Sequence, residues 1–145
     1  MHLPVAPSCN IACRFCGIEA NKTEKRPGAY SEVLTPISAL DKIRTILKKY
    51  DYITTIGVAG PGDPLANVET FETLKLVSEE FPSLMRCICT NGLALPESIK
   101  LLKNVNLTAL TVTVNAINPE IGSQIIDYVC YKGEKIRGEK GSSIL

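Results

Sequence analysis

The sequence predicts an α/β fold in which about four βα units build a parallel sheet. Short apolar segments rich in β-branched residues alternate with segments of helical periodicity, and turn residues follow each apolar segment. Strands separated by single helices are joined by right-handed crossovers and therefore run parallel. At 145 residues the chain has the length of one ordinary domain.

The first predicted strand, residues 2–7, leads into a loop that contains three cysteines. Pro27-Gly28 marks a turn. Thr35-Pro36 has the pattern of an N-cap followed by proline at the first helical position, and the helix is predicted to end near Tyr50. The apolar residues expected on the buried side of this helix are Ile37, Leu40, Ile43 and either Ile46 or Leu47.

The second predicted strand, residues 52–59, stops at the rigid segment 60–64, because glycine and proline do not continue a strand. Asn67 is predicted to cap a second helix that ends before Pro82. Residues 84–90 form the third predicted strand, which is closed by Asn91 and Gly92.

Pro96 opens a third predicted helix, and residues 107–115 form a fourth strand. Asn118-Pro119 then supplies a cap and a proline for a fourth helix. We predict a core domain over residues 1–130. The mixed charges and glycines of residues 131–145 predict a poorly ordered polar tail or the start of a truncated helix.

The charge is nearly balanced, with 16 basic and 15 acidic residues. Such a chain has no strong field to attract nucleic acid or an anionic membrane, and small-molecule partners fit it better. No apolar run approaches the roughly 18–20 residues of a membrane span. The first residues do not resemble a signal peptide. We therefore predict a cytoplasmic protein.

Chemically distinctive residues follow each of the four predicted strands. They are Cys9, Cys13 and Cys16 after the first strand, residues 60–64 after the second, residues 90–92 after the third, and Asn115 after the fourth. In parallel α/β folds, ligands bind beyond the carboxyl ends of the strands, so these segments are predicted to form one site. The alternative is that βα loops simply need turn residues.

The spacing of the first three cysteines, with three and then two residues between them, indicates a metal centre. Thiolates select iron–sulfur clusters, zinc or copper(I). Three ligands on a four-iron cube leave one iron free, whereas structural zinc needs a fourth ligand. Cys87 and Cys89 lie two apart in a strand and share a face, so a zinc site, a disulfide and plain buried cysteines are the alternatives.

This cysteine loop resembles the signature of radical S-adenosylmethionine (SAM) enzymes, which have a parallel (β/α) barrel. Phe15 matches the aromatic residue common before the last cysteine, and residues 60–64 resemble the segment that receives the SAM amino group. The resemblance implies that Cys9, Cys13 and Cys16 hold a [4Fe–4S] cluster. It also implies that this cluster reduces SAM and releases a 5′-deoxyadenosyl radical.

Further segments resemble the NifB family of nitrogenase cofactor-biosynthesis proteins within that superfamily. They are residues 2–11, 26–28, 31–36, 59–67, 90–96 and 112–116. The resemblance implies assembly of an eight-iron cofactor precursor for nitrogen fixation from SAM and iron–sulfur cluster substrates. It also implies iron–sulfur scaffold or carrier proteins and an electron donor as partners.

The same resemblance implies roles for further residues. Those expected to line the SAM pocket are Gly60, Gly62, Asp63, Asn91, Thr113 and Asn115. Asp63 is expected to accept a hydrogen bond from the SAM amino group. His2 and Cys87 match positions that ligate additional clusters in the family. Taken alone, His2 fits a solvated terminal histidine and Cys87 a buried strand cysteine.

The chain departs from the family pattern in three ways. No cysteine occurs in residues 17–26, where the family has one more cluster ligand. About four of six expected βα units are present, and the family's carboxy-terminal paired cysteines are absent. We therefore expect a fragment, a split gene or a degenerate homologue, with an uncovered sheet edge that favours association. The alternative functions are a radical SAM enzyme with another substrate and a non-catalytic iron–sulfur carrier.

Overall fold

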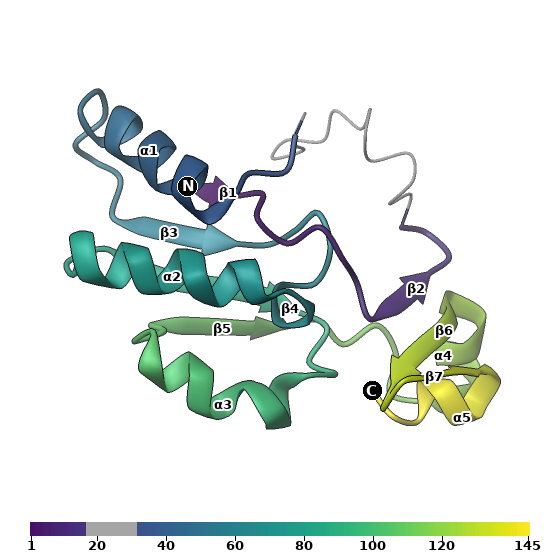
Figure 1. Ribbon diagram of the computed structural model, residues 1–145. Coiled ribbons are helices and arrows are strands. Elements are labelled where there is room, and N and C mark those ends of the chain that lie inside the picture. The colour runs from purple at the N-terminus through teal and green to yellow at the C-terminus, as the bar shows by residue number, and fades with distance from the viewer. Residues whose placement is uncertain (17–31) are drawn as a thin grey trace.

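The computed structural model describes residues 1–16 and 32–145, which form two sheets linked by helices (Figure 1). The strands of the larger sheet, in spatial order, are β1 (His2–Leu3), β3 (Thr55–Val58), β4 (Met85–Thr90) and β5 (Ala109–Val112). All neighbouring pairs in this sheet are parallel. This confirms the predicted α/β fold with a parallel sheet, the arrangement of a partial (β/α) barrel.

Three helices pack on one face of this sheet: α1 (Pro36–Leu47), α2 (Val68–Glu80) and α3 (Leu95–Asn104) (Figure 1). Leu3, Ile56 and Ile88 are fully buried against them. Side chains alternate between the faces of a strand. The neighbouring residues His2, Gly57 and Cys87 therefore belong to the opposite face, which we call the open face.

The helix starts depend on local capping, and two of the predicted caps are confirmed. The Thr35 hydroxyl accepts a hydrogen bond from the Ser38 N–H at 3.2 Å. The Asn118 side chain accepts one from the Glu120 N–H at 2.8 Å, where α4 (Pro119–Ile125) begins. The end of α1 differs from the prediction, because it lies at Leu47. Ile37, which was predicted to be buried, is 60% exposed because it lies in the first turn, outside the contact with the sheet.

The second sheet was not predicted. It is antiparallel and contains β2 (Ile11–Cys13), β6 (Ile126–Tyr131) and β7 (Glu134–Arg137). The short helix α5 (Gly138–Ser142) follows and contacts α4. The polar tail predicted for residues 131–145 is therefore a hairpin strand and a helix. Lys132 and Gly133, at φ values of 50° and 84°, form the tight turn between β6 and β7.

The first strand is shorter than predicted, because Pro4 cannot donate a ladder hydrogen bond. At the other side of the sheet, every residue of β5 is exposed, so within the described residues this strand is an uncovered edge, as expected. None of the described helices is long and apolar enough to cross a membrane. The predicted turn at Pro27-Gly28 lies outside the described residues.

Candidate functional site

The loop that contains the first three cysteines leaves the carboxyl end of β1 and lies against the second sheet (Figure 1). Its central part is β2, which pairs with β6. The Cys130 N–H donates to the Asn10 carbonyl at 2.8 Å, and the Arg14 N–H donates to the Ile125 carbonyl at the same distance. The hairpin that the sequence did not reveal is thus what holds the cysteine loop in place.

Cys9, Cys13 and Cys16 are half-buried and form no disulfide. Burial raises the pKa of Cys9; hydrogen bonds from the Ile11 and Asn10 backbone oppose this effect, and the nearby charges of Asp63 and Cys16 add to it. Burial also raises the pKa of Cys13, to about 11, with further contributions from the thiolates of Cys9 and Cys16. These mutual contributions indicate that the fold holds the three sulfur atoms near one another, although their negative charges would repel.

Three thiolates held close together repel one another unless a positive charge lies nearby. Coordination of Cys9, Cys13 and Cys16 to iron would supply this charge. Among residues 1–16 and 32–145, no three His, Cys, Asp or Glu side chains converge closely enough to hold a single metal ion. This argues against the zinc alternative. In an iron–sulfur cube, each thiolate binds a different iron at a separate corner, so the ligands need not meet at one point. The donor chemistry therefore fits a [4Fe–4S] cluster with one iron left free.

The segment after β3 docks directly against the cysteine loop. The Gly62 N–H donates to the Ala6 carbonyl at 2.6 Å, and the Asp63 N–H donates to the Ser8 carbonyl at 2.9 Å. A methyl group on Gly62 would lie 2.0 Å from the Ser8 carbonyl oxygen. Gly62 is thus required for the close approach of two backbones.

Asn67 was predicted to cap α2, and this prediction is wrong. Asn67 precedes the helix, but its side chain makes no capping hydrogen bond. Its amide instead accepts from the Ser8 N–H at 3.0 Å and donates to the Ser8 carbonyl at 2.8 Å. The amide group pairs with the backbone as another peptide would, and so fixes the residue before Cys9. The sequence holds no signal that separates this use of asparagine from capping.

Asp63 is the internal acceptor of the site. Its carboxylate is 4% exposed and begins the short 3₁₀ helix Pro64–Ala66 by accepting from the Leu65 N–H at 2.9 Å. It also accepts from the Thr90 hydroxyl at 2.8 Å and from the Asn91 N–H at 2.6 Å. The carboxylate was expected to face the SAM amino group. The structure instead commits it to the protein, where it joins the segments that follow β3 and β4.

Asn91 links β4 to the cysteine loop. Its side-chain NH₂ donates to the Asn10 side-chain oxygen at 2.7 Å and lies 3.9 Å from the Cys9 sulfur. Its own oxygen accepts from the Leu93 N–H at 2.9 Å. Asn10 was missed as a site residue, although it lies directly after Cys9 in the sequence.

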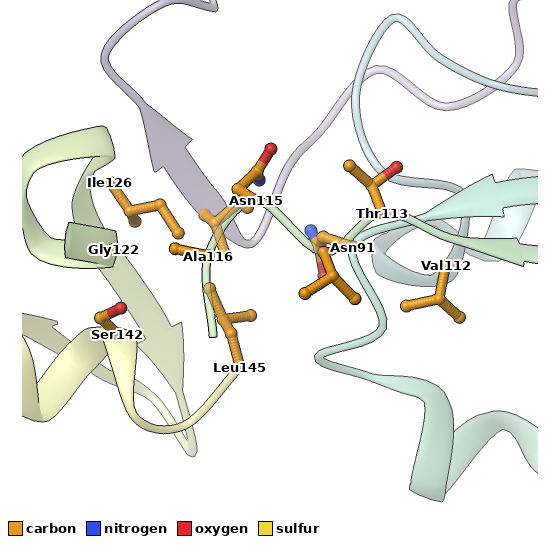
Figure 2. Close-up of a pocket in the computed structure, with 11 residues that line it drawn as sticks. Asn91, Val112, Thr113, Asn115, Ala116, Gly122, Ile126, Ser142 and Leu145 are labelled. Carbon is orange, nitrogen blue, oxygen red and sulfur yellow. The ribbon is translucent and has the colours of Figure 1, made fainter. Parts of the chain in front are cut away.

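A small pocket, with a cavity volume of about 30 Å³, lies between the carboxyl end of β5 and the second sheet. Figure 2 shows Asn91, from the segment after β4, with Thr113 and Asn115, from the segment after β5. These three predicted residues share the pocket with apolar side chains such as Val112 and Ile126. Gly60, Gly62 and Asp63 do not line it; Gly62 and Asp63 hold the adjacent loop instead. The structure therefore brings half of the predicted SAM-pocket residues into one cavity.

His2 and Cys87 lie in a separate place, on the open face of the sheet. His2 pairs in register with Gly57, and Gly57 pairs with Cys87. A methyl group on Gly57 would lie 2.7 Å from the Cys87 sulfur and 2.9 Å from Cδ2 of His2. The two side chains therefore meet over a glycine. Burial raises the pKa of Cys87, and the neighbouring Cys89 adds to this effect.

Comparison with known proteins agrees with this geometry. Residues 3–138 match the Radical SAM superfamily. The chain is 50% identical to "FeMo cofactor biosynthesis protein NifB" of Methanocaldococcus infernus, over all of this chain and 49% of that protein. The proteins of the same name in Methanocaldococcus jannaschii and Klebsiella pneumoniae are 47% and 42% identical, and the chain covers 49% and 31% of them. The chain thus spans about half the length of the first two relatives.

The superfamily match covers most of the chain and includes the three-cysteine loop, the parallel strands and the segments that dock on that loop. The resemblance expected from the motifs is confirmed. The chain belongs to the radical SAM superfamily.

Proposed function

We propose that this chain is a radical SAM iron–sulfur protein of the NifB type, which acts in assembly of the nitrogenase cofactor precursor. The observation that carries the proposal is the docking of the cysteine loop at the carboxyl ends of the strands, where Asn91 reaches both Asn10 and Cys9. Ligands of parallel α/β folds bind at this end of the sheet. The names of the relatives supply the cofactor-assembly context.

In this proposal, Cys9, Cys13 and Cys16 would each bind one iron of a [4Fe–4S] cluster, and SAM would bind beside them against the segments that follow β4 and β5. When bound, the cluster and SAM together supply one-electron cleavage of a carbon–sulfur bond. The amides of Asn91 and Asn115 and the hydroxyl of Thr113 provide polar contacts for a ligand in the pocket. Val112 and Ile126 provide apolar surface beside these polar groups.

His2 and Cys87 are proposed to bind an iron–sulfur cluster that serves as substrate. A soft thiol and an imidazole that meet over Gly57 suit iron. The reaction also needs an electron donor and iron–sulfur carrier proteins. We expect these partners, like the chain itself, in the cytoplasm.

Anaerobic reconstitution followed by electron paramagnetic resonance (EPR) tests this function. We expect a reduced-cluster signal that changes shape when SAM is added, because SAM would bind the free iron. Cys13→Ser should lose this signal. Cys130→Ser is the matched control, since Cys130 is also half-buried but lies on β6, outside the cysteine loop. The absence of any SAM-sensitive signal, or a SAM-sensitive signal that survives Cys13→Ser, contradicts the proposal.

One observation favours a second candidate, a radical SAM enzyme with another substrate. Residues 17–26 contain no cysteine, so the additional cluster ligand of the NifB family is missing there. Iron counting separates the two candidates. About four irons per chain favours a different substrate, and more than about eight favours NifB-type chemistry.

A further inference from the structure

The open face of the larger sheet carries a second cysteine beside Cys87. Cys87 and Cys89 are two residues apart in β4, so both side chains project from the same face. Ile88 between them is fully buried against the helices. Both cysteines are only half-buried, because no helix of the described residues covers the open face.

The strand register arranges this face in rows. His2, Gly57 and Cys87 form one row across β1, β3 and β4. Cys89 lies in the next row, opposite Thr111 of β5. Two residues along a strand span about 6.6 Å, so Cys89 lies about that far from Cys87, toward the carboxyl end of the sheet. This direction is toward the cysteine loop.

We infer that Cys89 is an additional iron ligand, which together with His2 and Cys87 holds an iron–sulfur cluster on the open face. Two thiols at this spacing suit neighbouring corners of a cube, and the imidazole of His2 approaches Cys87 from the other side of Gly57. The inference rests on the proposed function for the kind of cluster that is bound. Its ligand set, however, comes from the register of β1, β3 and β4.

Two observations favour a cluster over other uses of these residues. A single zinc ion needs its ligands to converge, and no three such side chains do so in the described parts of the chain. The two thiols also lie on one face of β4, with Ile88 between them buried on the other face. Ligands spread over several irons satisfy both observations.

The test uses the full chain with the SAM cluster removed. The triple variant Cys9→Ser/Cys13→Ser/Cys16→Ser lacks the proposed ligands of the SAM cluster. After anaerobic reconstitution it should still bind about four irons per chain, and its reduced-cluster EPR signal should not change when SAM is added. Addition of Cys89→Ala should lower both the iron content and the signal at least about five-fold, as should addition of Cys87→Ala. Addition of Cys130→Ala, the matched control on β6, should leave both unchanged.

The result that overturns the inference is a Cys89→Ala protein with the same iron content and spectrum as its parent. A triple variant without iron overturns it as well, while a SAM-sensitive signal in the unmodified protein would still support the proposed function. Conversely, iron that depends on Cys89 in a protein without any SAM-sensitive signal supports the inference and rejects the proposed function.

A second measurement covers variants that fail to fold. Alkylation of the unmodified protein, read residue by residue by mass spectrometry, compares metal-free and reconstituted samples. Because iron-bound thiolates do not react as nucleophiles, we expect labelling of Cys89 to fall at least about five-fold on reconstitution, and labelling of Cys130 to change less than about two-fold. Equal labelling of Cys89 in both samples overturns the inference.

Discussion

The carboxylate of Asp63 accepts a hydrogen bond from the Asn91 N–H at 2.6 Å and thereby joins two loops that are 28 residues apart. Asn91 in turn reaches the cysteine loop through Asn10. The buried carboxylate of Asp63 therefore helps to position three loops, which follow β1, β3 and β4.

Asp63→Asn is expected to destabilise the protein by about 1–3 kcal/mol, because an amide nitrogen would face the N–H and O–H donors that the carboxylate now accepts. Urea unfolding measures the change in free energy. Asp51→Asn, at an exposed carboxylate, is the control and should change stability little. Equal effects of the two substitutions would show that Asp63 is not the buried acceptor described above.

Gly62→Ala is expected to separate the two loops, because the new methyl group would lie 2.0 Å from the Ser8 carbonyl oxygen. Iron content after reconstitution should fall several-fold. Gly133→Ala is the contrasting control. Its φ of 84° makes the substitution strained, yet its Cβ would meet no atom within 4 Å. That variant should lose stability but bind iron normally, and loss of iron in both variants would refute the proposed loop contact.

Gly57→Ala is expected to push His2 and Cys87 apart, because its methyl group would lie within 3 Å of both side chains. In the variant without the SAM-cluster cysteines, the remaining iron should fall several-fold. In the otherwise unmodified chain, the SAM-sensitive EPR signal should persist, because Gly57 does not contact the cysteine loop. Unchanged iron on the open face would rule out a shared site for His2 and Cys87.

The metal-free protein should lose stability at alkaline pH. Burial raises the pKa of Cys13 from 9.0 to about 11, so the folded state favours the protonated thiol. This contribution is fully present below pH 9 and is lost as the pH rises toward about 11, because the unfolded chain releases the proton first. Denaturant unfolding between pH 8 and 11 measures the slope. Cys13→Ala should make this slope shallower, and an unchanged slope would assign it to other groups.

Thr70→Val is expected to stabilise the protein by about 1 kcal/mol, because the Thr70 hydroxyl is fully buried and has no hydrogen-bond partner among the described residues. Thr73→Val is a close control on the same helix. The Thr73 hydroxyl is also in a fully buried residue but donates to the Glu69 carbonyl at 2.7 Å. This substitution should not stabilise. Thermal unfolding measures both, and stabilisation by Thr73→Val alone would reverse the argument.

Local features of the fold were predictable because their causes lie within a few residues. Thr35-Pro36 and Asn118-Pro119 begin helices as predicted, since a cap needs only its own side chain and the next turn. Asn67 also stands directly before a helix, but its side chain serves another purpose. The backbone of Ser8, 59 residues earlier, competes for its amide, and no local pattern reveals such a competitor.

The second sheet was missed for a related reason. The Lys132-Gly133 turn between alternating segments was a usable hairpin signal, but the mixed charges around it suggested a polar tail. The partner of β6 is β2, inside the cysteine loop and far away in the sequence. Only pairing with that distant strand buries Ile126 and Val129.

The sequence alone predicted the parallel βα order, which the structure confirms, and a metal-binding role for Cys9, Cys13 and Cys16, because periodicity and ligand spacing are local properties of the chain. Tertiary structure decided the rest. It turned Asp63 inward as an acceptor for Asn91, and through the strand register it placed His2, Cys87 and Cys89 on one open face. These relationships depend on which distant backbones meet, and that is settled only when the strands pair and the loops dock.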